Sequence, residues 1–124
     1  MVRKCKIRIN TYCFLVILRD IPTAEEIWKN LPIQSNVQIW SEEIYFNCSI
    51  FSATEKKSVE VLNFGEIAFW PCGKVIVIGF GKTPISKNNE IRLVDKCNVW
   101  EDTKLNLKKL KNIKINEIVT VEKN

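Results

Sequence analysis

Apolar residues recur at every second position in several short stretches, and this pattern most narrows the fold that the chain can adopt. Within residues 4–10 and 44–50, an apolar residue alternates with a polar or charged one. A period of two places the two kinds of side chain on opposite faces of a β-strand. Further stretches rich in Ile and Val predict strands at 12–18, 37–39, 59–61, 66–70, 74–81, 97–100 and 117–121. We therefore expect a mainly β protein with about eight strands.

Two short helices are also predicted. Thr23-Ala24-Glu25-Glu26 has the form of a capping box, in which the side chains of Thr23 and Glu26 each accept a hydrogen bond from the other's backbone amide. Residues 24, 27, 28 and 31 follow at helical spacing, and Pro32 is expected to end this helix. Asp102 is predicted to cap a second helix that carries Leu105, Leu107 and Leu110.

The length of the chain indicates one domain that spans residues 1–124. A chain of 124 residues can bury a core of its own, and it contains no internal repeat, low-complexity tract or linker. Strands that alternate in this way, with few signs of exposed edges, favour a closed barrel whose open ends are covered by the two helices.

The positive charge is gathered in two regions, 3–8 and 104–114, and the net charge is +5. Such clusters can attract nucleic acid or an acidic membrane. A solvated surface is the favoured interpretation, because no aromatic residue is interleaved with the C-terminal lysines as a stacking platform. The apolar run 12–18 is too short to cross a membrane. We therefore expect a cytoplasmic protein that binds neither nucleic acid nor membrane.

Several kinds of chemistry are disfavoured by the residues present. The chain has no His, which removes the commonest general base and metal ligand. Its five cysteines form no C-x-x-C pair, so no metal site and no cofactor are predicted. The thiols are expected to be reduced, and a disulfide between two strand cysteines is the alternative. Cys72 follows Trp70 and Pro71 but has no His to activate it, so a structural or incidental thiol is expected there.

Glu42 and Glu43 are a pair of carboxylates that could suggest acid–base catalysis. Adjacent positions on a strand point to opposite faces, so both side chains cannot face one substrate unless a turn intervenes. We expect this pair to face solvent.

The order of several motifs resembles cyclophilins. Residues 21–28 are similar to the first cyclophilin helix, and residues 65–70, followed by Gly73 and Gly79-Phe80, are similar to a core segment of that family. The closer resemblance is to a prokaryotic family of small cyclophilin-like proteins of unknown function, the TM1367-like domain family. Its motifs match 40–46, 65–73 and 80–84, except that Ser41 stands where the family has Gly. This resemblance implies a closed eight-stranded cyclophilin-like β-barrel capped by two short α-helices.

Isomerase activity is not expected from the resemblance. Peptide-bond rotation faces a barrier of roughly 18–20 kcal/mol. Cyclophilins lower it with an arginine aimed at the proline nitrogen, carried by a Phe-His-Arg stretch and followed by a Gln-Gly-Gly element. The matching segment here, 36–49, contains no Arg, His or Gly. No catalytic residue is therefore predicted, and whether the chain is an enzyme stays open, with a non-enzyme favoured.

Trp70, Pro71 and Phe80 fall where cyclophilins line their hydrophobic groove, and Trp40 and Tyr45 come from the neighbouring strands. The candidate ligand-binding residues are Trp40, Tyr45, Trp70, Pro71, Phe80 and Thr83, with Arg92 as a cationic contact to be tested. Simple core packing is the alternative for each of them. We expect a module that binds a proline-containing peptide or a small molecule. A weak prolyl isomerase, or an accessory subunit that joins a larger amidohydrolase-type protein partner, are the alternatives.

Overall fold

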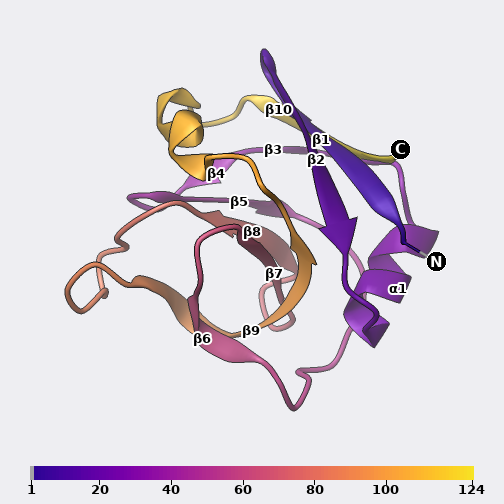
Figure 1. The fold of residues 1–124 in the computed structure, drawn as a ribbon, viewed down its shortest axis with the longest axis horizontal. Coiled ribbons are helices and arrows are strands. Elements are labelled where there is room, and N and C mark those ends of the chain that lie inside the picture. The colour runs from indigo at the N-terminus through magenta and orange to yellow at the C-terminus, as the bar shows by residue number, and fades with distance from the viewer. Residues whose placement is uncertain (1) are drawn as a thin grey trace.

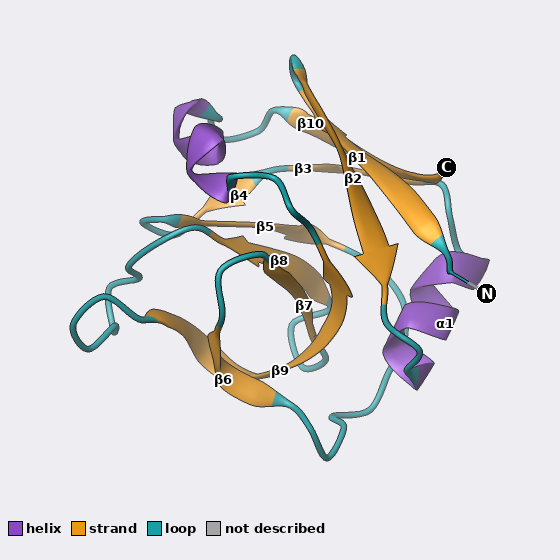
Figure 2. Ribbon diagram, viewed as in Figure 1, coloured by secondary structure: helices purple, strands orange, loops and turns teal. Residues whose placement is uncertain are grey.

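The computed structural model describes residues 2–124 and contains ten strands, one α-helix and one 3₁₀ helix (Figure 1). In chain order these are β1 (Lys4–Ile9), β2 (Tyr12–Leu18), α1 (Pro22–Lys29), β3 (Ile33–Asn36), β4 (Gln38–Ile39), β5 (Glu43–Asn47), β6 (Val59–Leu62), β7 (Glu66–Trp70), β8 (Val75–Gly79), β9 (Ile91–Asp102), η1 (Leu107–Asn112) and β10 (Ile118–Lys123). The mainly β prediction is confirmed (Figure 2).

The strands form one antiparallel sheet that curls into a nearly closed barrel. Its order is β3-β10-β1-β2-β9-β7-β8-β5-β4, and β6 pairs with β9 outside this path. The two ends of the path approach each other where β3 lies beside β5 (Figure 1). The expected barrel is therefore present, with two more strands than the eight predicted.

The barrel interior is filled by the inward-facing residues that the period-two pattern predicts. Ile7, Ile9, Phe46 and Phe69 are fully buried there. The two helices contribute Ala24, Ile27, Leu107 and Leu110 to the same cluster, α1 from the right and η1 from the upper left of Figure 1. Both helices therefore cover the barrel as expected.

Both predicted helix caps are wrong. The residue before α1 is Ile21, and Thr23 lies inside the helix with its hydroxyl bonded to Ser52 and Glu55 instead of to the helix amides. The helix ends at Lys29, before Leu31. The second helix begins later than predicted, and Asn106 caps it through a hydrogen bond from the Lys108 amide.

Asp102 cannot cap η1 because it ends β9, a strand of 12 residues where only 97–100 had been predicted. There the Asp102 carboxylate accepts two hydrogen bonds from Arg19. This contact raises the pKa of the Arg19 guanidinium. Glu66 binds the same guanidinium at 2.8 Å.

The length of β9 allows it to serve two layers. Its last residues pair with β2 and β7 in the barrel wall, whereas its first residues pair with β6. The strand bends at a register shift opposite Ile67 and Ala68. As a result, β6 and the first half of β9 fold over the outer face of β7 and β8 (Figure 1) and enclose a second, smaller hydrophobic cluster. Its buried members are Leu62, Ala68, Val77, Ile91, Leu93, Cys97 and Val99.

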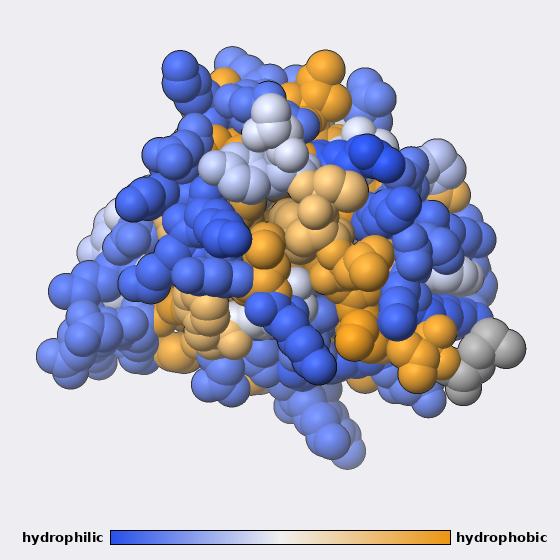
Figure 3. Space-filling view, turned by 45° about the horizontal axis from the view of Figure 1, so that its top comes forward, coloured by the Kyte–Doolittle hydropathy of each residue, from blue (hydrophilic) through white to orange (hydrophobic). Residues whose placement is uncertain are grey.

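Hydrophobic side chains also reach the outside of the protein. Figure 3 shows a face on which they gather at the centre, within a surround of hydrophilic residues. On β2, Leu15 and Ile17 occupy outward positions and are 48% and 40% exposed. No helix in residues 2–124 combines the length and the apolar character that a membrane crossing requires.

Candidate functional site

A pocket of about 200 Å³ opens at the edge of the second hydrophobic cluster. Its lining comes from strands far apart in the sequence: Trp40, Glu43, Tyr45, Trp70, Val75, Val77, Leu93 and Val94. Three of the predicted groove residues, Trp40, Tyr45 and Trp70, therefore meet in one place. The pairing of strands explains this, because β5 and β7 lie on either side of β8.

Strand geometry places two of these side chains on one face. Glu43 and Tyr45 are two residues apart on β5 and point to the same side. Tyr45 lies opposite Val77 of β8, which also belongs to the lining. Trp40 is held close by a hydrogen bond from its backbone amide to the Glu43 carbonyl, 2.9 Å long, which closes the turn before β5.

Two contacts hold the Trp70 indole in the pocket wall. Its Nε1 donates a hydrogen bond to Oδ2 of Asp95 at 3.1 Å, which ties β7 to β9. Gly73, in the turn after β7, lies directly under the ring. Trp70 is therefore a positioned side chain rather than a loose surface aromatic.

Glu43 is the unexpected member of the pocket, and the expectation that the Glu42–Glu43 pair faces solvent is wrong for it. Glu43 is only 5% exposed, and its Oε1 finds no hydrogen-bond partner among residues 2–124. Burial raises its pKa to about 8. Glu42 is exposed, as expected, and its carboxylate accepts a hydrogen bond from the Lys82 amide. The opposite orientation of adjacent strand residues did not predict that Glu43 is buried, because a second layer covers the outer face of β5.

Three of the predicted groove residues, Phe80, Pro71 and Thr83, lie elsewhere. Phe80 is buried in the barrel interior, and Pro71 lies in the turn after β7, outside the pocket lining. Thr83 is buried, and its hydroxyl donates to the Arg92 carbonyl at 2.6 Å. Thr83 thereby anchors the loop before β9 rather than facing the pocket.

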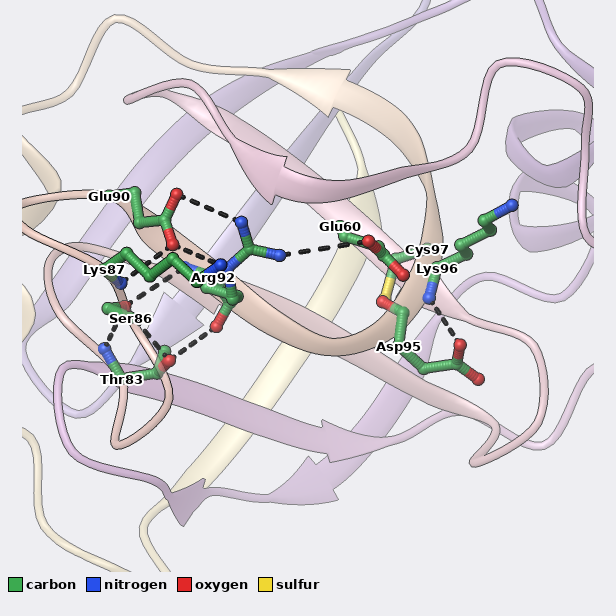
Figure 4. Close-up of polar contacts among 9 residues, drawn as sticks. All are labelled: Glu60, Thr83, Ser86, Lys87, Glu90, Arg92, Asp95, Lys96 and Cys97. Carbon is green, nitrogen blue, oxygen red and sulfur yellow. Dashed lines mark hydrogen bonds and ion pairs between the residues drawn. The ribbon is translucent and has the colours of Figure 1, made fainter.

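Arg92, the cation proposed for the groove, is held by acidic side chains (Figure 4). Its Nε donates to Oε1 of Glu90 at 2.6 Å, and its Nη1 lies 3.9 Å from Oε2 of Glu60. The guanidinium in turn holds the pKa of Glu90 below its usual value. Arg92 is not among the residues that line the pocket, and its guanidinium is directed to Glu90 and Glu60 instead.

The cysteines form no disulfide in the described residues. Cys5, Cys48 and Cys97 are buried, whereas Cys13 and Cys72 are exposed. Burial raises the pKa of both Cys5 and Cys48 to about 12. The same effect, with a contribution from the nearby Glu43, raises the pKa of Cys97. The three buried thiols are therefore poor nucleophiles.

The chain thus folds into a small, nearly closed β-barrel. A helix follows the second strand, and an aromatic pocket lies on the outer face of the barrel. Comparison with known proteins shows the family to which this barrel belongs. The Cyclophilin-like family model matches residues 3–122, so the chain belongs to the Cyclophilin-like family.

A solved structure has the same fold. The solution structure of the hypothetical protein AF2241 from Archaeoglobus fulgidus is 33% identical to this chain and superposes on it with a TM-score of 0.83. The match covers 99% of this chain and 95% of the archaeal one. No curated protein matches the sequence.

Proposed function

We propose that this cyclophilin-like domain is a binding module, and that the pocket between β5, β7, β8 and β9 takes a small ligand or one side chain of a short peptide. The observation that carries the proposal is the convergence of Trp40, Tyr45 and Trp70 on one pocket. Ligand sites are typically concave and mostly apolar, with a few polar groups that orient the ligand. Here Val75, Leu93 and neighbouring aliphatic side chains supply the apolar walls.

The size of the pocket limits the occupant. Pockets for drug-sized ligands hold roughly 300–1,000 Å³, whereas this one has about 200 Å³. A proline ring, another compact side chain or a small metabolite suits that volume better than an extended cofactor. The aromatic rings offer flat apolar surfaces against which such a group can pack.

Efficient prolyl isomerisation is not part of this proposal. A cyclophilin-type reaction needs a cation beside the proline nitrogen to stabilise the twisted amide. In residues 2–124 every arginine is paired with a carboxylate: Arg3 with Glu25, Arg8 with Glu122, Arg19 with Glu66 and Asp102, and Arg92 with Glu60 and Glu90. The pocket lining in the described chain contains no arginine or lysine.

Titration followed by NMR tests the proposal. Proline-containing peptides and small amines, alcohols and amides would be added to millimolar concentration, with the indole N–H signals as reporters. We expect shifts at Trp40 and Trp70, and loss of binding in Trp70→Ala. Trp28→Ala is the matched control, because Trp28 is also partly buried but lies on α1, against Arg3 and Lys123.

Two results would contradict the proposal. One is the absence of any shift at the pocket with every probe, and the other is equal weakening of binding in the two tryptophan variants. A coupled assay on an Xaa-Pro peptide addresses isomerisation separately, and turnover comparable to that of an arginine-bearing cyclophilin would disprove that part alone.

A further inference from the structure

The carboxyl group of Glu43 gives this apolar pocket a definite chemical preference. It is the only acidic side chain in the pocket lining of the described chain, and it is more than nine-tenths buried. Its Oε1 is left without a partner in residues 2–124. A buried polar atom without a partner is costly, and such atoms in native proteins often mark a place where another group binds.

We propose that the pocket binds a small organic cation, an ammonium or trimethylammonium group on a short apolar body, with Glu43 as its counter-ion. This inference rests on the proposed binding function and names the ligand class. An ammonium group placed between aromatic rings is attracted by their negative faces. Trp40, Tyr45 and Trp70 surround the space beside Glu43 and supply those rings.

The strand pairing excludes water from one side of Glu43. Its direct partner across the sheet is Gly79 of β8. A methyl group of Ile91 occupies the space where a side chain at Gly79 would stand, 2.4 Å from the position of its missing Cβ. Glu43 is thus desolvated by β9, and a cation that enters the pocket meets a carboxyl group with few competing water molecules.

The charges near the pocket favour a cation although the whole chain carries +5. Asp95 of β9 accepts a hydrogen bond from Trp70 and adds negative charge at the rim of the pocket. The phenol of Tyr45 also lines the pocket. The thiol of Cys97 lies nearby, and its pKa is raised by burial and then by the charges of Glu43, Asp95 and Cys72. Of the two cations on β9, Lys96 is exposed and neutralises part of the Asp95 charge, and Arg92 is paired with Glu60 and Glu90.

Two probes of the same shape separate charge from packing. Choline carries a trimethylammonium group, and 3,3-dimethylbutan-1-ol replaces its nitrogen with carbon. Above about pH 8, where Glu43 is ionised, we expect choline to bind the full chain at least about tenfold more tightly in calorimetric or NMR titrations, because a desolvated ion pair with aromatic contacts favours the charged probe. Glu43→Gln should abolish this difference and still bind the neutral alcohol. Glu42→Gln is the matched control, since Glu42 is exposed and outside the lining, and it should retain the difference.

A pH series adds a second readout. Choline keeps its charge at every pH, whereas Glu43 must lose its proton to become a counter-ion. Because burial raises the pKa of Glu43 to about 8, choline binding should tighten about tenfold per pH unit between roughly pH 6 and pH 7. Binding of the neutral alcohol should not change in this way.

Each outcome decides between the two proposals. Equal affinity for choline and the alcohol, or a choline affinity that does not change with pH, overturns the cation inference and leaves the aromatic pocket standing. No binding of either probe, together with no shift from any ligand in the wider titration, overturns the proposed function itself. Preference for choline that survives in Glu43→Gln also overturns the assigned role of Glu43.

Discussion

The indole ring of Trp70 lies directly on Gly73, so close that a Cβ at Gly73 would stand 2.3 Å from Cε3 of the ring. The turn after β7 thus needs a residue without a side chain for the pocket wall to form. This contact gives a physical reason for the glycine in the Trp-Pro-x-Gly segment, in which Trp70 and Gly73 flank Pro71 and Cys72.

Gly73→Ala should therefore displace the indole. We expect a loss of about 1–3 kcal/mol in the free energy of unfolding, because an added methyl group in a packed site forces its neighbours to move. The hydrogen bond from Nε1 to Asp95 should break, and ligand binding should weaken. Urea unfolding and the Trp70 indole resonance measure the two effects. Cys72→Ala in the same turn is the control, and wild-type behaviour of Gly73→Ala would refute the packing argument.

Ser41→Gly should stabilise the protein. Ser41 has φ +56°, in the left-handed region that costs a side-chain-bearing residue roughly 1–2 kcal/mol. Glycine avoids this cost but loses more entropy on folding, so we expect a net gain of about 0.5–1 kcal/mol in urea unfolding. Ser35→Gly, in the extended strand β3, should instead destabilise the protein. A destabilised Ser41→Gly variant would show that the serine side chain makes a stabilising contact.

The sequence predicted the barrel wall well where the period of two was clear. The alternation in 4–10 and 44–50 correctly gave the inward faces of β1 and β5. Of the seven predicted site residues, Trp40, Tyr45 and Trp70 lie together, and the strands of Tyr45 and Trp70 meet through β8. Whether these residues bind a ligand stays a prediction.

Two failures, the burial of Glu43 and the missed start of β9, have a common physical cause, which is the second layer formed by β6 and the first half of β9. Ile91 and Leu93 alternate with Arg92 and Val94, but this pattern is too short to predict a strand before residue 97. Without that layer, Glu43 has no reason to be buried. Sequence periodicity describes the two faces of a strand, and it cannot reveal that a distant segment covers the outer one.

Thiol reactivity should separate the five cysteines into two groups. The exposed Cys13 and Cys72 should react rapidly with a disulfide reagent, whereas Cys5, Cys48 and Cys97 should react only as the protein unfolds. The buried group is slowed by lack of access and by raised pKa values, since the thiolate is the reactive form. The release of chromophore over time gives both phases. Cys13→Ala combined with Cys72→Ala should remove the fast phase, and a third rapidly reacting thiol would contradict the burial of these side chains.

Stability should fall as the pH rises from about 5 to 8, because two carboxyl groups hold protons in the folded state. Glu101 of β9 is fully buried, neither of its oxygens has a partner in residues 2–124, and burial raises its pKa well above the ordinary value. Glu43 behaves similarly, with a pKa raised to about 8. The unfolded chain releases both protons near pH 4.5, so the stability that these groups contribute is complete below that pH and is lost as the pH rises through the folded-state pKa values.

The absence of histidine from the chain makes this pH window informative, since no imidazole titrates within it. Each carboxyl can contribute up to about 1.4 kcal/mol per pH unit to the slope of unfolding free energy against pH. Glu101→Gln should flatten the slope by one such contribution and raise stability relative to wild type most at pH 8. Glu43→Gln should remove the other contribution. Urea unfolding at pH 5, 6, 7 and 8 measures both, with Glu42→Gln as the control for an exposed carboxylate. A wild-type slope in Glu101→Gln would mean that this buried carboxylate is ionised throughout, and that a positive group reaches it inside the barrel.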